Sequence, residues 1–200
     1  RDQVLTFGVE RVDAVFITHP HADHIFGFDD IRRFSDLQKG HIPVYGSPET
    51  IASMRIKFDY VDKVSHSFGG VPRVIFTEMA APVETGGLRV TPVPVMHGED
   101  IIYGFRVDAD GKSLAYIPDC SGIPETSFQT LELLDVMILD GLRQGKHATH
   151  FSIEECVKHL QRIGAKRSFL THLTHHSNHD MLQSSLPAGM AIPWDGLTVF

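Results

Sequence analysis

The segment Thr18-His19-Pro20-His21-Ala22-Asp23-His24 decides how the rest of this chain is interpreted. Three imidazoles and one carboxylate lie within six residues there, directly after the apolar run 12–17. That run is short, rich in β-branched residues and bounded by polar residues, which predicts a buried strand. Alternate side chains of the turn after a strand can point at one place, so we expect His19 and His21 to share a metal ion. Asp23 and His24 are expected to serve a second ion, because imidazole and carboxylate bind zinc and related metals.

The composition indicates a folded globular chain. With 200 residues, 42% of them hydrophobic and 22% charged, we expect one domain over residues 1–200. No apolar run approaches the roughly 20 residues that span a bilayer, so no membrane partner is expected. The formal charge of −7 argues against nonspecific binding to nucleic acid. Cys120 and Cys156 are too few for a disulfide scaffold, and free thiols favour a cytoplasmic location.

Short apolar runs alternate with helical patterns along the rest of the chain. Turn residues, namely Gly, Pro and the pair Asp-Gly, separate these runs. The pattern predicts strands at 42–46, 73–77, 88–95, 103–107, 113–117, 136–139, 167–171 and 197–200. Helices are predicted over 22–34, 48–58 and 124–134, and one more begins at the capping box Ser152-Ile153-Glu154-Glu155 and ends at Gly164. Residues 59–72 and 173–188 are expected to be loops that set specificity, with His66 a solvated histidine in the first.

Further potential ligands follow the later strands. His97, Asp119, Asp140 and His172 each stand at the end of an apolar run or in the turn just beyond it. For one such residue, a role in a turn or cap is the simpler explanation. Several in succession, after a four-ligand motif, favour side chains that gather at one edge of the sheets.

The His19–His24 segment resembles the metallo-β-lactamase superfamily, whose signature is His-X-His-X-Asp-His at a strand end. The resemblance implies an α/β fold (α+β in some schemes), a four-layer αββα sandwich, with N-terminal strands preceding Arg1. It implies that His19, His21 and His97 hold one ion and that Asp23, His24 and His172 hold the other. Asp119 would bridge them, with Asp23 also counted as catalytic. His175, His176 and His179 are alternatives for the last ligand.

The same resemblance implies two divalent ions about 3.5–4 Å apart that bridge a hydroxide, which would be the nucleophile. The motif contains no thiolate, and the third position is His21 rather than the glutamate of the diiron oxygen reductases in this superfamily. Zinc is therefore favoured, and mixed imidazole and carboxylate sites also accept manganese.

A second cluster is similar to the phosphodiesterase branch of the superfamily, which includes ribonuclease Z and the cyclic-phosphate phosphodiesterase of phosphonate breakdown. In that branch a His-Ser-Thr-like motif before a helix supplies a histidine held by an acidic residue. Here His150 would be the general acid and Asp140 its partner, since an alkoxide leaving group needs a proton. The sequence reads His150-Phe151-Ser152, so a helix cap is the other role open to Ser152.

Neighbouring residues are candidates for contacts with the substrate. His147 is a second donor or a phosphate contact, and Arg143 or Lys146 is expected to hold an anionic substrate. His175 and His179 are expected to line the pocket, with solvated surface histidine as the alternative.

The leading hypothesis is a binuclear metal-dependent hydrolase, a phosphodiesterase that acts on a small phosphorylated substrate. A carboxyl-ester or thioester hydrolase similar to lactonases or glyoxalase II is the alternative, and a non-catalytic metal-binding protein is the remote one. A small-molecule partner is expected, with nucleic acid disfavoured and a homodimer as one option. The exact substrate, zinc against manganese and the oligomeric state stay open.

Overall fold

The strand expected before the histidine motif forms over Val15–Phe16 (β1) in the computed structural model, which describes residues 1–63 and 70–199. It pairs in parallel with β2 (Ile42–Gly46), which pairs in parallel with β3 (Val74–Glu78). The N–H of Ile17 donates to the carbonyl of Tyr45 at 2.8 Å, so the bonding extends one residue beyond β1. The histidine motif therefore begins where a sheet strand ends.

The chain divides into two compact units, residues 1–81 and 82–200. Besides its three strands, the first unit contains the helices α1 (Asp2–Thr6), α2 (Ala22–Ile25), η1 (Phe28–Asp30), α3 (Ile31–Gln38) and α4 (Pro48–Lys57). Its core packs apolar side chains of the sheet against those of the helices, including Ile17, Val44, Ile51 and Met54. The expectation that residues 1–200 form one domain stays a prediction.

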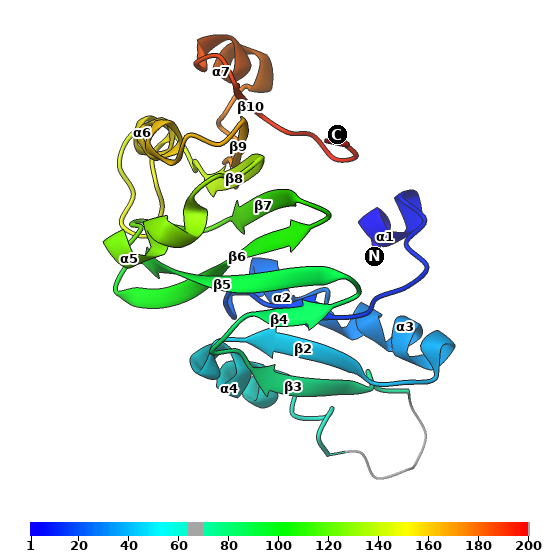
Figure 1. Cartoon of the computed structure of the whole chain (residues 1–200). Coiled ribbons are helices and arrows are strands. Elements are labelled where there is room, and N and C mark those ends of the chain that lie inside the picture. Colours follow the sequence, from blue (N-terminus) through cyan, green and yellow to red (C-terminus); the bar gives the residue numbers. More distant parts are fainter. Residues whose placement is uncertain (64–69, 200) are drawn as a thin grey trace. The chain divides into compact units, whose positions relative to one another are not determined.

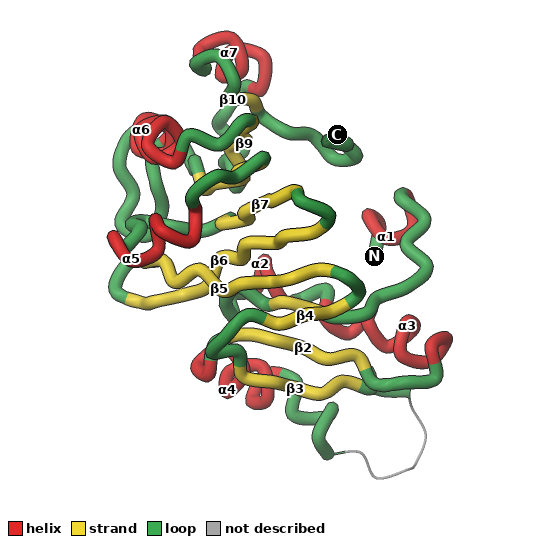
Figure 2. Tube along the Cα trace, in the orientation of Figure 1, coloured by secondary structure: helices red, strands yellow, loops and turns green. Residues whose placement is uncertain are grey.

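The second unit is built on a seven-stranded sheet in the order β10-β9-β8-β7-β6-β5-β4 (Figure 1). Its strands are β4 (Val83–Thr85), β5 (Leu88–His97), β6 (Asp100–Ala109), β7 (Lys112–Ile117), β8 (Val136–Asp140), β9 (Arg167–Thr171) and β10 (Met190–Ala191). Its helices are α5 (Glu125–Phe128), η2 (Gln129–Leu131), α6 (Ile153–Ile163) and α7 (His179–Ser185), coloured red in Figure 2. Strands β7 to β10 run parallel, and β4 to β7 form an antiparallel meander.

The parallel register sets which residues share an edge of this sheet. Ile117 lies beside Leu139, and Asp140 lies beside Thr171. Asp119 follows β7 by two residues, Asp140 ends β8, and His172 follows β9 directly. All three therefore come to the carboxyl edge of the parallel strands, where loops carry function in layered α/β proteins.

Helix α6 begins and ends where the sequence predicts. Both hydrogen bonds of the Ser152–Glu155 capping box are present, and Gly164 ends the helix in the left-handed region at φ 67°. Because the cap uses the side chain of Ser152, its structural role is accounted for without any part in chemistry.

Besides the strand expected over 12–17, which forms only over Val15–Phe16, three predicted elements are wrong. The expected helix over 22–34 is broken into α2, η1 and α3, because the chain turns at Gly27, whose carbonyl accepts from the N–H of Asp30 in a tighter 3-10 turn. The helix expected over 124–134 stops at Leu131, and Leu133 takes a left-handed φ of 56°. Residues 197–199 form no strand, and Leu197 closes a turn by donating to the carbonyl of Trp194 at 3.0 Å.

Several short elements were not predicted from the sequence. Residues 173–188 were expected to form only a loop, yet α7 forms there, capped by the side chain of Asn178. The elements α1, β4 and β10 have too few residues to show a period. The prediction for His66 lies outside the described residues. No helix in the described ranges combines the length and apolar character of a membrane span.

Candidate metal centre

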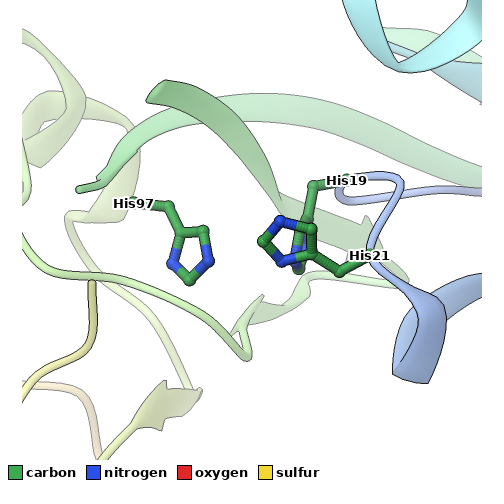
Figure 3. A group of neighbouring side chains, drawn as sticks. All are labelled: His19, His21 and His97. Atoms are coloured by element: carbon green, nitrogen blue, oxygen red, sulfur yellow. The ribbon is translucent and has the colours of Figure 1, made fainter. Parts of the chain in front are cut away.

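The histidine motif forms a tight cluster within the first unit. His19 and His21 leave the loop after β1 with Nε2 of His19 3.0 Å from Nδ1 of His21 (Figure 3). The ring of His24 lies 4.2 Å from that of His19, and Nε2 of His24 is 3.5 Å from Oδ2 of Asp23. The nitrogen atoms of the three motif histidines and a carboxylate oxygen of Asp23 thus lie close together, and the division of these residues between two ions stays a prediction.

His97 ends β5 in the second unit (Figure 3), and its ring is held by a hydrogen bond to the backbone. Its Nδ1 lies 2.7 Å from the backbone carbonyl of Thr149. A carbonyl can only accept, so Nδ1 carries the proton and Nε2 keeps its lone pair for a metal. Gly98 follows at φ 67°, and a Cβ there would lie 3.0 Å from a side-chain carbon of Thr149. The glycine therefore lets the chain turn against the residue that orients His97.

Asp119 is the central carboxylate of the second unit and is 2% exposed. Its Oδ2 lies 3.9 Å from Nε2 of His97 and 3.9 Å from Nδ1 of His150, while its Oδ1 lies 3.5 Å from Nε2 of His172. The two oxygens thus face different histidines, an arrangement in which one carboxylate can serve two cations.

His150 is held by Asp140. Nδ1 of His150 donates to Oδ2 of Asp140 at 2.8 Å, and the same oxygen accepts the N–H of Cys120 at 2.8 Å. Asp140 is fully buried; burial raises its pKa, and the hydrogen bonds from His150 and Cys120 act in the opposite direction. This contact fixes the orientation of the ring through Nδ1.

Phe151 anchors the segment that carries His150. Its N–H donates to the carbonyl of Cys120 at 2.6 Å, and its carbonyl accepts the N–H of Leu142 at 3.0 Å. Its ring is buried and stacks on the ring of His159 at 4.4 Å. The departure from His-Ser-Thr therefore places an apolar residue in a core position and keeps the backbone in place.

His172 occupies a strained backbone position, with φ at 61° directly after β9. A non-glycine residue in the left-handed region costs free energy and is often found at functional sites. Its ring stacks on that of His150 at 4.9 Å. The rings of His175 and His176 contact each other at 3.9 Å, and both are exposed together with His179. His172 is therefore the residue of this group that faces Asp119, and it stays the predicted ligand.

The residues that were predicted to contact the substrate lie in different surroundings. The ring of His147 lies 5.1 Å from that of His150, and burial lowers the pKa of His147, with His150 and Arg143 acting in the same direction. Arg143 lines a cavity together with His176, while His175 is exposed and lies outside that lining, so the role of His175 stays a prediction.

Two contributors to this site carry no signal in the sequence. The carbonyl of Thr149 orients His97, and the N–H of Cys120 holds Asp140. Both are backbone groups, which every residue except proline offers equally, so residue type could not reveal them. The only indirect signal is Gly98, directly after the strand-end histidine.

Residues 4–173 match a known protein family that is described as the β-lactamase superfamily domain. The chain belongs to the β-lactamase superfamily. The structural comparison agrees: a solved structure of a new diphosphatase from the PhnP family aligns with a TM-score of 0.88 at 34% identity, covering 98% of this chain and 74% of that one. This superfamily member therefore has the expected metallo-β-lactamase fold, which is a fold of metal-dependent hydrolases.

Two curated relatives of this β-lactamase superfamily chain have different names. A protein named octanoyltransferase from Porphyromonas gingivalis is 30% identical over 201 residues, which cover 98% of this chain and 39% of that protein. Ribonuclease BN from Escherichia coli O1:K1 is 28% identical, over 79% of this chain and 52% of that protein. The chain thus spans between two fifths and about half of their lengths.

The donor set suits divalent metal ions. Within the second unit, one ligand atom each from His97, Asp119 and His150 lie within 4.8 Å of one another, and so do those from Asp140, His150 and His172. The first unit contains a cluster of its own, made of three histidines and Asp23. Neutral imidazole and carboxylate without thiolate is the donor chemistry of zinc and manganese sites, so the residues fit the metals that the family implies.

Proposed function

We propose that this chain is a binuclear metal-dependent phosphodiesterase that acts on a small phosphorylated substrate. The hydrogen bond between His150 and Asp140 is the observation that carries the proposal. It supports a proton donor at the edge of the sheet where the strand-end ligands gather. Membership of a superfamily of metal-dependent hydrolases and the likeness to a diphosphatase support the same reading.

We assign the ions to the ligands that the family resemblance implies. His19, His21 and His97 would hold one ion, and Asp23, His24 and His172 the other, with Asp119 between them. When bound, two such ions activate a water molecule as the nucleophile and offset the charge of a phosphoryl group. Zinc is the proposed metal, with manganese as the other ion that this donor set accepts.

The chain's own residues would then manage the leaving group. Asp140 stabilises the protonated form of His150 through the 2.8 Å hydrogen bond to Nδ1, so the second proton sits on Nε2. From Nε2 it can pass to the departing oxygen, which an alkoxide needs and a thiolate does not. His147, beside His150, is proposed to contact the phosphoryl oxygens.

The alternative hydrolase class gains no specific support from the site. A thioester loses a thiolate that departs unprotonated, so the buried His150–Asp140 pair would have no task. Ribonuclease BN suggests RNA as a substrate class, but the charge of −7 disfavours a polyanion as large as RNA.

The test is a substrate panel on the metal-loaded protein. We expect hydrolysis of bis(p-nitrophenyl) phosphate, with weaker turnover of a thioester, a lactone and a structured RNA. Preference for the thioester or lactone by kcat/KM would overturn the phosphodiesterase assignment, and preference for RNA would replace the small substrate. Metal analysis by mass spectrometry, with two ions per chain expected, tests the binuclear site separately.

A further inference from the structure

Thr149 lies between two histidines of the second unit and contacts them with different atoms. Its backbone carbonyl accepts a hydrogen bond from Nδ1 of His97 at 2.7 Å. Its backbone N–H lies 3.4 Å from Nδ1 of His147, and its hydroxyl oxygen lies 3.3 Å from the same nitrogen. One residue therefore contacts Nδ1 of both rings, as an acceptor for His97 and as a donor for His147.

The direction of each hydrogen bond fixes where each ring carries its proton. A backbone N–H can only donate, so Nδ1 of His147 must accept, and the neutral ring then carries its proton on Nε2. A carbonyl can only accept, so the neutral ring of His97 carries its proton on Nδ1. The two rings thus have opposite tautomers, and each tautomer is set by a different atom of Thr149.

The side chain of Thr149 is held so that its hydroxyl faces His147. A Cβ on Gly98 would lie 3.0 Å from Cγ2 of Thr149, so the methyl group packs directly against that glycine. Both branches leave the same Cβ, and a β-branched side chain is stiff at χ1, so packing of the methyl group also fixes the direction of the hydroxyl. The N–H and the hydroxyl can therefore act together on Nδ1 of His147.

His147 lies next to the proposed proton donor within the same unit. Its ring is 5.1 Å from that of His150, which in turn is 4.8 Å from the ring of His97. His147 is exposed, so its ring can meet a ligand from solution. Partial burial lowers its pKa, and the charges of His150 and Arg143 act in the same direction, which favours the neutral ring. A neutral ring whose Nδ1 already accepts has one donor left to offer, the Nε2–H.

We propose that Thr149 is a positioning residue that keeps His147 as a neutral donor, with its proton on Nε2, for an anionic oxygen of the substrate's phosphoryl group. The carbonyl of the same residue keeps Nε2 of His97 free of a proton and available to an ion. Thr149 thus sets a hydrogen-bond donor and a metal ligand in opposite protonation patterns. This inference rests on the proposed function and adds the residue that orients its substrate contact.

The kinetic experiment removes the hydroxyl and the methyl group of Thr149 one at a time. Thr149→Val keeps the shape, the methyl group and both backbone groups, whereas Thr149→Ser keeps the hydroxyl and loses the methyl group. We expect Thr149→Val to raise KM for bis(p-nitrophenyl) phosphate by about 2- to 10-fold with a smaller change in kcat, the usual effect of losing a neutral hydrogen bond that serves binding. Thr149→Ser should raise KM less. If Thr149 only packs against Gly98, Thr149→Ser is the more impaired variant, and that order would overturn the inference.

Thr91→Val is the matched control, because it makes the same chemical change on β5, six residues before His97 and outside residues 147–150. Its KM should stay near that of the wild type. Thr149→Val retains the carbonyl that holds His97, so we expect it to keep its zinc, measured by mass spectrometry, and thermal melting identifies loss of folding. An unchanged KM in Thr149→Val, a loss of zinc that accounts for its lower activity, or an equal rise of KM in Thr91→Val would each count against Thr149.

Long-range 1H–15N NMR of the histidine rings separates this inference from the proposed function, because it needs no turnover. In the zinc-loaded wild-type protein we expect a single tautomer for His147, protonated on Nε2, and the opposite tautomer for His97. Thr149→Val should show a larger share of the Nδ1–H form of His147 than Thr149→Ser does. If the wild type hydrolyses no phosphodiester, the proposed function fails, and the tautomers still decide about Thr149. A mixture of tautomers in wild-type His147, or a proton on its Nδ1, refutes the inference.

Discussion

His150→Ala should separate proton transfer from metal binding. The variant removes the ring whose Nδ1 donates to Asp140 at 2.8 Å, while the proposed ligands stay in place. Loss of a positioned general acid costs about 10²- to 10⁴-fold in rate when the leaving group needs a proton. We therefore expect a loss of that size for an alkyl phosphodiester and a much smaller loss for p-nitrophenolate, which departs as a stable anion.

Asp140→Asn should have a smaller effect than His150→Ala. The asparagine keeps an oxygen for the N–H of Cys120 but loses the negative charge that stabilises protonated His150. A hydrogen bond to a charged group contributes about 1.5–3 kcal/mol, so we expect roughly a 10- to 100-fold fall in kcat for the alkyl phosphodiester.

The assay is a series of methyl aryl phosphates whose phenols differ in acidity, with metal content measured on every protein. The logarithm of kcat should depend weakly on leaving-group acidity in the wild type and steeply in His150→Ala. An equal fall across the series would refute the role of His150 as the acid. Loss of an ion from His150→Ala would make it a ligand instead, which its 3.9 Å separation from Asp119 makes a real alternative.

Three further predictions concern metal and stability. Asp119→Ala should lose bound metal and activity together, measured by mass spectrometry and hydrolysis of bis(p-nitrophenyl) phosphate, and retention of both ions would contradict its bridging role. Ser152→Ala should cost about 0.5–2 kcal/mol of unfolding free energy in urea through loss of the α6 cap, and a loss in kcat without a loss in stability would point to chemistry instead. Hydrogen bonds from Ser152 lower the pKa of Glu155, so the stability they give is present above the unfolded glutamate pKa of about 4.3 and is lost as pH falls through the lower folded value. Glu155→Gln should flatten that part of the pH dependence of urea unfolding, and an unchanged slope would contradict it.

The sequence predicts well those elements that have turn or capping residues at both ends. β2 and β9 match their predicted ranges, and α6 follows its capping box, because the boundary residues themselves make the terminating contacts. The break near Gly27 was missed because Ile25, Phe28, Ile31 and Phe34 keep helical spacing. A tighter turn still buries Ile25, Phe28 and Phe34, so the apolar pattern does not reveal the break.

Only part of the candidate site could be predicted from the sequence. His97, Asp119, Asp140 and His172 could be predicted because each is the first polar side chain at or after an apolar strand. The backbone groups that orient them could not, since Thr149 and Cys120 act through a carbonyl and an N–H. The left-handed backbone of His172 is equally invisible, because even the residue types enriched in that conformation, histidine among them, adopt it at only a small share of their positions.

The aligned ends of β7, β8 and β9 limit how this scaffold can change. Successive side chains of a strand point to opposite faces, so adding or deleting one residue within β8 would turn Asp140 away from His150. Loops beyond the strands have no such alternation of side chains between two faces. Lineages that diverge from this protein are therefore free to lengthen the segments after Asp140 and His172, whereas the strand lengths can change only in steps of two residues. New specificities should accordingly appear as loop insertions on an unchanged sheet.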